Sequence, residues 1–479
     1  MLFNSLPFFL FFPIVFVVYW LLSKYRVLQN ILLLVASYVF YGWWDPRFLI
    51  LIFISSLADY LIGLQLSKAS SKGGRKAWLG LSLAVNLGVL GYFKYADFFI
   101  NSFVEAFASL GMDLSVPTLQ IILPVGISFY TFQTLSYTID IYRGKMQPTR
   151  DPISFFAFVS FFPQLVAGPI ERAADLLPQF YRERVFSLRL ATDGGRQALW
   201  GFFKKVVIAD TCGQFVDQVF SLAKTGEGVP YLYLFGAILF TIQIYADFSG
   251  YSDIAIGLAR MLGFHLSTNF RSPYLAKNLV EFWHRWHITL STWFRDYVYI
   301  PLGGNRVKPF RRYFNVFATF LLSGLWHGAG WNFLIWGGLH GFFYSLTTLV
   351  PKPSWGGWGL RILSTLLTFC IVVVAFVFFR ASDYMEAIAV FYRMLGHTAW
   401  EPVSEIHRVA DLAHWNYLIM LGMALAIIMV AVEGINHRWH HGLYVRHLPR
   451  VVRWVIYLAL IVAIWACFGS NKPFIYFQF

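Results

Sequence analysis

The chain has 479 residues, of which 58% are hydrophobic, 20% aromatic and only 13% charged. Soluble domains carry about 25% charged residues, so this composition excludes a soluble protein and indicates one embedded in a membrane. The net charge of +14 would favour nucleic acid in a soluble protein, but here the basic residues lie in short loops between apolar runs, so no nucleic-acid partner is expected.

Residues 1–115 alternate apolar runs with short basic loops. The runs at 6–22 and 48–64 approach the roughly 20 residues that cross a bilayer. The first run has no basic start and no small-residue cleavage site, so we expect a retained span and not a signal peptide. Because lysine and arginine mark cytoplasmic loops, the basic stretches at 24–26 and 67–76 predict that the first span ends inside and that the N-terminus lies outside.

Residues 120–345 are less hydrophobic and rich in glycine, proline, asparagine and tryptophan. Non-helical backbone at membrane depth is tolerated only where protein buries it or where it lines a watery cavity. This composition therefore predicts a catalytic core with re-entrant segments around a cavity. Residues 360–479 return to simpler spans, interrupted by a polar loop or surface helix at 397–415. We expect one all-α polytopic domain over residues 1–479, with about 10 to 12 crossings.

The first polar stretch of the core is "QIYADFSGYSDIAIGLARMLG" at 243–263, which contains Asp247 and Asp253. Ionisable groups within a membrane are costly and either pair or mark a pathway. Two interpretations therefore stay open. The carboxylates pair with a basic residue such as Arg260 or Arg271 and fix helix packing, or they line a substrate path.

The second stretch is "EFWHRWHITLSTWFRDYVYIPLGGNR" at 281–306. On a helix, His284 and His287 are three residues apart and share a face. Alternating aromatic and basic residues are typical of an interfacial helix, and the glycines at its end predict a loop. The helix is either an anchor without chemistry or part of a site.

The third stretch, "SGLWHGAGWNFLIWGGLHG" at 323–341, places two histidines in apolar sequence, and its glycines make one unbroken helix improbable. His340 has the character of a core residue. His327 follows a tryptophan and precedes glycines, with Asn332 nearby, so we expect the small residues to leave room for a ligand at the ring. A buried imidazole stays neutral and accepts a proton near neutral pH, which suits a general base acting on a hydroxyl group.

The sequence also has features of two other classes of function, a di-iron oxygenase and a transporter. The H-x-x-H-H pattern at 437–441 and the H-x-x-H at 284–287 resemble parts of di-iron oxygenase boxes. No H-x-x-x-H box accompanies them, and the first lies among arginines, so no metal site is predicted. A transporter is the other alternative, since buried Asp, Arg and His also mark transport pathways, but the sequence shows no inverted repeat.

Together with "PFIYFQF" at 473–479, these three stretches resemble the membrane-bound O-acyltransferase family, in particular its bacterial branch that acetylates exported polysaccharides. The resemblance implies a ring of membrane helices around a central funnel or tunnel, in the bacterial inner membrane. The family's principal histidine matches His327, and its second recurrent polar residue matches His287. Relatives usually carry arginine where this chain has His284.

The resemblance also implies the reaction. An acetyl group would come from a cytosolic thioester, expected to be acetyl-CoA, with no bound cofactor. His327 would act as general base or acyl-accepting residue, while His287, Asn332 or a backbone N–H would stabilise the oxyanion. The residues expected to line the donor or substrate path are Asn332, Trp326, Trp286, Asp253 and Arg285.

The implied acceptor is an exported polysaccharide such as alginate. The implied partners are a periplasmic acetyltransferase of the serine-hydrolase type, the machinery of polysaccharide synthesis and export, and membrane lipid. Basic cytosolic loops suit a polyanionic donor and anionic lipid equally well. Within the same family, D-alanyl transfer to teichoic acids is the alternative.

Overall fold

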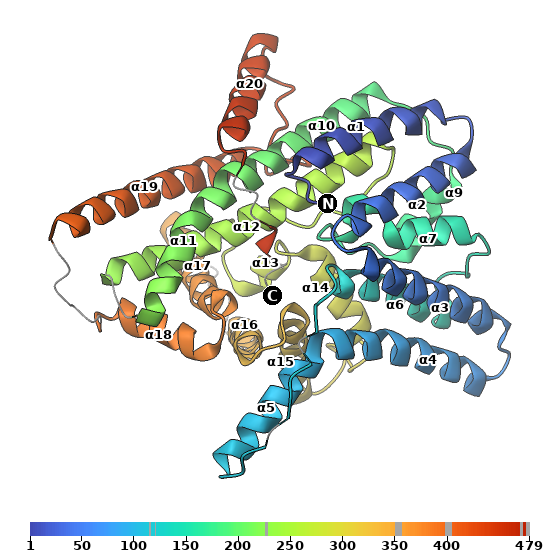
Figure 1. The fold of residues 1–479 in the computed structure, drawn as a ribbon, viewed down its shortest axis with the longest axis horizontal. Coiled ribbons are helices and arrows are strands. Elements are labelled where there is room, and N and C mark those ends of the chain that lie inside the picture. The colour runs from blue at the N-terminus through green and yellow to red at the C-terminus, as the bar shows by residue number, and fades with distance from the viewer. Residues whose placement is uncertain are drawn as a thin grey trace. The chain divides into compact units, whose positions relative to one another are not determined.

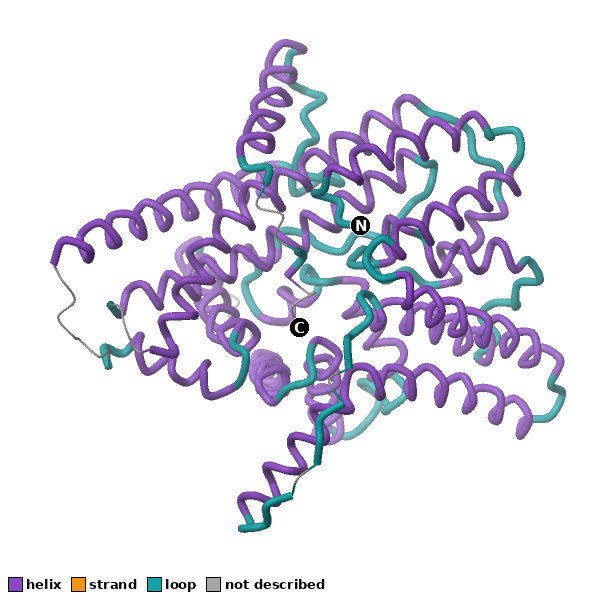
Figure 2. The backbone as a smooth tube through the Cα atoms, viewed as in Figure 1, coloured by secondary structure: helices purple, strands orange, loops and turns teal. Residues whose placement is uncertain are grey.

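The computed structural model describes the chain except residues 115, 120, 226–228, 350–356, 398–404, 470–472 and 476–479. Its described residues form helices joined by loops, with no strand among them (Figure 2). The prediction of an all-α polytopic membrane protein is thereby confirmed. Of the polar segment expected at 397–415, the part at 398–404 lies outside the described residues, and the part from Glu405 onward begins a long helix.

Several described helices have the length and composition of membrane spans. Five are long and apolar enough to cross a bilayer: Pro46–Lys68, Lys72–Ser109, Pro230–Met261, Trp358–Arg380 and Leu412–Ile435. Shorter apolar helices lie at Leu6–Leu21, Arg26–Gly42 and Pro152–Leu165. The expected 6–22 and 48–64 runs are both helical, while the total number of crossings stays a prediction.

The chain divides into two compact units. The N-terminal unit comprises Met1–Gly195 and Ala255–Ser267, and the C-terminal unit comprises Arg196–Ile254 and Thr268–Phe479. The division falls within two helices, α10 (Leu188–Phe202) and α12 (Pro230–Met261).

The other helices of the N-terminal unit are α1 (Leu6–Leu21), α2 (Arg26–Gly42), η1 (Pro46–Phe48), α3 (Leu49–Lys68), α4 (Lys72–Leu90), η2 (Gly91–Tyr95), α5 (Ala96–Ser109), α6 (Ile127–Tyr142), α7 (Pro152–Ser160), α8 (Phe162–Leu165) and α9 (Ala173–Tyr181). Helix α3 packs against α4 and α6. A buried polar network joins these three helices: the Asp59 carboxylate on α3 accepts hydrogen bonds from Ser82 and Asn86 on α4, both at 2.7 Å, and the Thr134 hydroxyl on α6 donates to the Asn86 amide oxygen at 3.1 Å.

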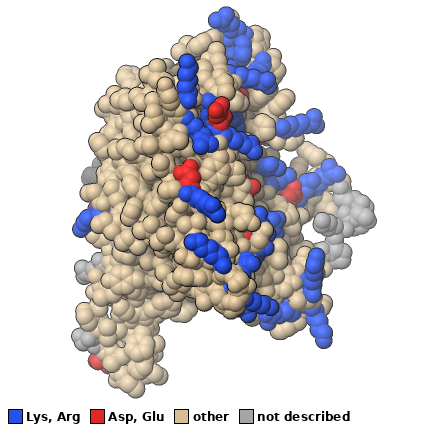
Figure 3. Space-filling model, turned by 90° about the vertical axis from the view of Figure 1, so that its right-hand side faces the viewer, with Lys and Arg blue, Asp and Glu red and all other residues tan. Residues whose placement is uncertain are grey.

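Basic side chains are prominent on the surface of the N-terminal unit. Its exposed lysines include those of the two loops expected to be cytoplasmic, Lys24, Lys68, Lys72 and Lys76, and its exposed arginines include Arg182 and Arg189. Figure 3 shows a face on which Lys and Arg gather and on which Asp and Glu are few. A surface of this kind suits contact with anionic headgroups.

The other helices of the C-terminal unit are η3 (Phe203–Ala209), α11 (Asp210–Thr225), η4 (Pro273–Leu275), α13 (Leu279–Trp283), α14 (Ile288–Phe294), η5 (Arg295–Tyr299), α15 (Pro309–His327), α16 (Trp331–Leu349), α17 (Trp358–Arg380), α18 (Tyr384–Met394), α19 (Glu405–Ile435) and α20 (Arg450–Ala466). Helices α15 and α16 form a tightly packed hairpin (Figure 1). Helix α16 also packs against α13 and α17.

Glycines bring the two helices of this hairpin together. A Cβ on Gly324 would lie 2.3 Å from the backbone oxygen of Phe333, and one on Gly337 would lie 2.4 Å from that of Phe320. The helix break predicted from the glycines is confirmed, since α15 ends at His327 and α16 begins at Trp331. The expectation that small residues leave room for a ligand is wrong at Gly328, because the Phe333 ring fills the space beside it: a Cβ on Gly328 would lie 2.0 Å from that ring. These glycines serve close packing between helices.

Candidate active site

His287 lies at a break between two short helices. Helix α13 ends at Trp283 and α14 begins at Ile288, with His287 in the left-handed conformation at φ 41° and ψ 54°. The expected continuous helix with His284 and His287 on one face is therefore wrong: His284 is exposed, whereas His287 is fully buried. A left-handed backbone costs a non-glycine residue about 1–2 kcal/mol, a strain that is common at functional sites.

The segment before α13 holds this strained turn in place. The backbone N–H of Ile288 donates to the Asn269 carbonyl at 2.9 Å, and that of Arg271 donates to the Arg285 carbonyl at 2.9 Å. The side chain of Asn269 then reaches the ring, with its Oδ1 3.0 Å from Nδ1 of His287. Backbone and side chain of the same segment thus fix the position of the imidazole.

Aromatic rings enclose the rest of the His287 imidazole. Phe248 meets it edge-on at a centroid distance of 4.6 Å, and Phe270 stacks at 6.3 Å. This burial lowers the pKa of His287 from 6.5 to about 3, because the enclosure penalises the cation. His287 lies outside the candidate spans and is a neutral ring at physiological pH.

His327 is the last residue of α15, and its ring lies beside that of His287. The two ring centroids are 6.4 Å apart, and His327 is 3% exposed. Trp326, Trp336 and Phe379 pack against the His327 ring at 4.9, 5.0 and 5.3 Å. We call His287 and His327 the histidine pair.

His340 lies in the same aromatic core but not in the pair. Trp336 contacts both His327, at 5.0 Å, and His340, at 4.8 Å. The His340 ring also stacks on Phe282 with an interplanar angle of 6°. Neither of its nitrogens has a hydrogen-bond partner among the described residues. This environment agrees with the core role expected for His340.

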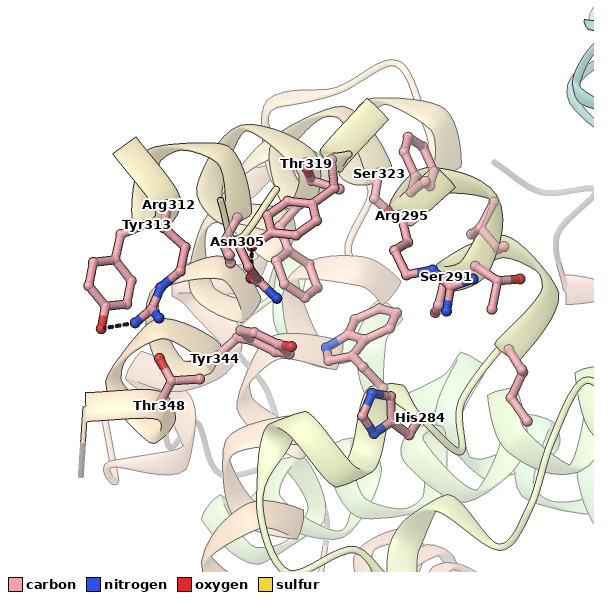
Figure 4. Close-up of a pocket in the computed structure, with 18 residues that line it drawn as sticks. His284, Ser291, Arg295, Asn305, Arg312, Tyr313, Thr319, Ser323, Tyr344 and Thr348 are labelled. Atoms are coloured by element: carbon pink, nitrogen blue, oxygen red, sulfur yellow. Dashed lines mark hydrogen bonds between the residues drawn. The ribbon is translucent and has the colours of Figure 1, made fainter. Parts of the chain in front are cut away.

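A cavity of about 660 Å³ lies between the α13–η5 segment and the α15–α16 hairpin; Ile288, the neighbour of His287, lines it, but neither histidine of the pair does. Arg312 and Tyr313 lie at one end and Arg295 and Ser291 at the other (Figure 4). Ser323 also lines it, four residues before His327 on α15, and therefore on the same side of the helix one turn away. The remaining lining residues are Trp283, His284, Ile288, Leu290, Thr292, Phe294, Tyr299, Asn305, Val316, Thr319, Phe320, Tyr344 and Thr348.

The structure distributes the other expected lining residues over different surroundings. The Trp326 ring contacts both rings of the pair, at 6.0 Å from His287. Trp286 packs among aromatic rings, with Phe270 at 5.1 Å. The Asn332 amide donates to the carbonyl of Ala381 at 2.8 Å, at the end of α17.

Arg285 pairs with Glu281 at 2.5 Å, and the two side chains are about one-third exposed (32% and 27%). This i, i+4 pair joins α13 to the linker that precedes His287. The pair is therefore partly exposed to the surroundings, next to the strained turn that carries the buried His287.

Asp247 and Asp253 pair with two consecutive lysines of η3. Lys205 lies 2.7 Å from Asp247 and 2.9 Å from Asp210. Lys204 lies 2.6 Å from Asp253 and 3.1 Å from Glu433. We call these six residues the lysine cluster.

Asp247 and Asp253 do pair with basic residues, as one of the two interpretations expected, but the expected partner residues are wrong. Arg260 instead pairs with Asp193 at 2.8 Å. Close backbone approach explains why the lysines reach α12: a Cβ on Gly201 would lie 2.5 Å from the Gly250 oxygen. The α10 and α12 backbones therefore touch just before η3, which turns both lysines toward α12.

Sequence reasoning missed Asn269, Lys204 and Lys205. Asn269 lies between two of the quoted stretches, and no spacing rule connects it to His287, eighteen residues later. Lys204 and Lys205 adjoin apolar residues in "FFKKVVI", which was the available signal that two cations enter a core. Among the described residues, no group of three or more His, Cys, Asp or Glu is arranged to hold a metal.

Comparison with known proteins gives consistent matches. Residues 149–380 match the membrane-bound O-acyltransferase family. The chain is 42% identical to the probable alginate O-acetylase of Pseudomonas aeruginosa, over 92% of this chain and 83% of the relative. It is 34% identical to the peptidoglycan O-acetyltransferase of Helicobacter pylori, over 100% of this chain and 98% of the relative. It is 26% identical to the teichoic acid D-alanyltransferase of Bacillus subtilis, over 54% of this chain and 69% of the relative.

Proposed function

We infer the reaction from the family: this chain belongs to the membrane-bound O-acyltransferase family and is therefore an O-acyltransferase. We propose that it moves an acetyl group from acetyl-CoA toward an exported polysaccharide such as alginate. The histidine pair carries this proposal. Two buried imidazoles with centroids 6.4 Å apart, one of them neutral by burial, form a site suited to proton transfer. Relatives named for O-acetylation cover most of the chain and favour acetyl as the group transferred.

The reaction needs a proton acceptor and a stabilised oxyanion. An imidazole of the pair takes the proton of the attacking hydroxyl. His327 is the candidate for the general base or for the residue that carries the acyl group, and His287 is the other ring that can take the proton. The thioester carbonyl becomes a tetrahedral oxyanion, which a hydrogen-bond donor stabilises, and the C–S bond then breaks. The proton passes to the leaving thiolate, so that the products are an ester and a free thiol.

The cavity between the α13–η5 segment and the α15–α16 hairpin is our proposed donor site. Its polar side chains include Arg295 and Arg312, which suit the phosphates of acetyl-CoA, and its wall at Ser323 lies one turn from His327. The loop that follows η5 and the first turn of α15 carry four basic residues, which favours a cytoplasmic position: Arg306, Lys308, Arg311 and Arg312. A donor entering there would present its thioester toward the membrane interior.

The same arrangement defines the proposed setting. The protein would lie in the bacterial inner membrane with its N-terminus outside and its basic loops against anionic lipid on the cytoplasmic side. A periplasmic acetyltransferase of the serine-hydrolase type would receive the acetyl group and pass it to the polymer, alongside the synthesis and export machinery.

D-alanyl transfer to teichoic acids is the second candidate, because a relative of that name matches about half of the chain. The greater identity and coverage of the relatives named for O-acetylation favour acetyl transfer. A D-alanyl thioester offered in place of acetyl-CoA distinguishes the two candidates.

The test is acetyl transfer from labelled acetyl-CoA by the purified protein in vesicles. We expect His327→Ala to reduce transfer by at least about 100-fold, the scale of a lost acid–base group, while the protein stays folded. His340→Phe is the matched control, since it replaces another buried imidazole of the same aromatic core and should keep transfer near the wild-type rate. Full activity of His327→Ala would refute the assignment.

The donor site has its own test. Arg312→Gln should raise the KM for acetyl-CoA by roughly 10-fold with little change in kcat, since it removes binding that is equal in the ground and transition states. A fall in kcat at unchanged KM would instead place Arg312 at the reacting atoms and would contradict a donor-binding role.

A further inference from the structure

The Asn269 side chain links three elements of the candidate active site. Its Nδ2 lies 3.1 Å from the Ser252 hydroxyl on α12. Its Oδ1 lies 3.0 Å from the Thr289 hydroxyl on α14 and 3.0 Å from Nδ1 of His287. Asn269 and Ser252 are 1% and 2% exposed, so water does not compete for these contacts.

The backbone of Thr289 fixes which end of the Asn269 amide faces the ring. Its N–H approaches the same amide atom, at 3.4 Å, and a backbone N–H can only donate. That atom is therefore the carbonyl oxygen. The Ser252 hydroxyl at the other end accepts from the NH2 group, which agrees with the same orientation.

An oxygen at this place determines the tautomer of His287. Carbonyl oxygen accepts and never donates, so Nδ1 of His287 must carry the hydrogen. In a neutral ring the other nitrogen is then bare. Nε2 of His287 is buried and has no hydrogen-bond partner among the described residues. The ring thus presents an unused proton acceptor.

We propose that Asn269 is a positioning residue that holds His287 in the Nδ1–H tautomer, so that Nε2 of His287 accepts the proton of the attacking hydroxyl. This inference rests on the proposed acyl transfer. The hydroxyl O–H bond breaks as its oxygen bonds to the thioester carbon, and the proton moves to Nε2. When the C–S bond breaks, the same proton passes to the departing thiolate, and the ring returns to its neutral form.

The tautomer also decides between the roles of the two histidines: His287 takes the proton, so His327 is not the general base in this scheme. A ring with its hydrogen on Nδ1 offers no donor at Nε2, so neutral His287 does not donate to the oxyanion. The amide of Asn332 is engaged with the Ala381 carbonyl at 2.8 Å. The oxyanion donor is therefore a backbone N–H or the second imidazole of the pair, His327.

Two substitutions at Asn269 test the assignment by kinetics. Asn269→Leu removes the acceptor while keeping the side-chain size, and we expect kcat to fall at least about 100-fold with KM changed less than about twofold. Asn269→Asp keeps an acceptor oxygen and adds a charge that favours the imidazolium. It should retain much of kcat and move the acidic limb of the pH–rate profile to higher pH, because the base must be unprotonated to act.

Asn436→Leu is the matched control for a purely structural loss. Asn436 is also buried, and its amide donates to the Gly442 carbonyl at 2.8 Å. Its replacement should lower thermal stability without moving the pH–rate profile or kcat. If both leucine variants lose kcat equally, Asn269 acts only through folding and the inference is overturned.

The tautomer can be read directly. In protein labelled with ring ¹⁵N-histidine, the signals that disappear in His287→Gln belong to His287, and we expect a protonated Nδ1 and a bare Nε2. A protonated Nε2 overturns the inference. If His287→Ala and His327→Ala abolish transfer but Asn269→Leu does not, the inference fails and the proposed function stands; if neither histidine variant loses transfer, the proposed function itself fails.

Discussion

The histidine pair and the lysine cluster are both buried polar groups of the C-terminal unit, yet they are built in opposite ways. In the lysine cluster each ammonium group faces two carboxylates at 2.6–3.1 Å. Around the histidine pair the close neighbours are largely aromatic rings, and Asn269 supplies a neutral hydrogen bond to His287. One region balances charge, and the other avoids it.

This difference separates architecture from chemistry. A charge in a low-dielectric interior is tolerated when it is paired, and the pairs of the lysine cluster tie neighbouring helices together. A neutral imidazole pays a small desolvation cost and keeps a nitrogen for proton transfer. The ionised residues of the middle section therefore join helices, while the neutral rings are the candidates for catalysis.

Lys205→Met should cause the largest loss in the free energy of unfolding, because it disrupts the charge balance of the lysine cluster. It leaves Asp247 and Asp210 facing each other without a cation, and breaking a buried pair in this way costs about 3–5 kcal/mol. It also removes the contact of the ammonium group with the Pro473 carbonyl at 3.4 Å. Unfolding by SDS titration in mixed micelles measures the free energy of unfolding.

Lys224→Met is the control for Lys205→Met. Lys224 lies 3.9 Å from Glu386 and its side chain is 62% exposed, so its loss should change the free energy of unfolding by less than about 1 kcal/mol. Equal losses in the two variants would show that burial does not set the strength of these pairs.

The pH dependence of stability should reveal the neutral ring of His287. Burial lowers its pKa from 6.5 to about 3, so between these values the unfolded chain binds a proton that the folded chain does not. Stability therefore falls as the pH drops below the unfolded pKa, by about 2 kcal/mol between pH 8 and pH 5. His287→Gln should lack this component, and an identical pH dependence in both proteins would contradict a neutral buried ring.

The sequence predicts helices and helix ends in this region better than it predicts contacts between residues far apart in the chain. Apolar runs predict spans, and glycines after His327 predict the end of α15, because both depend on neighbouring residues. The closeness of His287 and His327 comes from how α14 meets α15, 40 residues along the chain. The break at His287 is hidden for a similar reason: the aromatic and basic pattern continues through it, while remote hydrogen bonds to Asn269 impose the turn.

The partners of the α12 carboxylates illustrate the same limit. Arg260 lies seven residues after Asp253, which made it, like Arg271, an expected partner. Packing of α10 on α12 instead supplies Lys204, 49 residues before Asp253. Periodicity indicates that a helix buries a face but does not indicate which remote segment covers it.

Asp253→Asn should have a moderate effect, because it removes one charge of the lysine cluster and leaves Glu433 beside Lys204 at 3.1 Å. We expect a loss of about 1.5–3 kcal/mol, the value of a hydrogen bond to a charged group. Acetyl transfer per folded molecule should stay at the wild-type level if Asp253 serves architecture. A specific loss of transfer in folded protein would support the substrate path predicted from the sequence.

Arg285→Gln should have the smallest effect on stability, and it tests whether a partly exposed ion pair near His287 takes part in the reaction. The pair with Glu281 is about one-third exposed, so its loss should change the free energy of unfolding by less than about 1 kcal/mol. His284 lines the proposed donor cavity, whereas Arg285 is not among its lining residues. The KM for acetyl-CoA should therefore stay unchanged in Arg285→Gln, in contrast to its rise in Arg312→Gln. A similar rise would mean that Arg285 leaves Glu281 to contact the donor, and that an ion pair in this protein can be part of the chemistry.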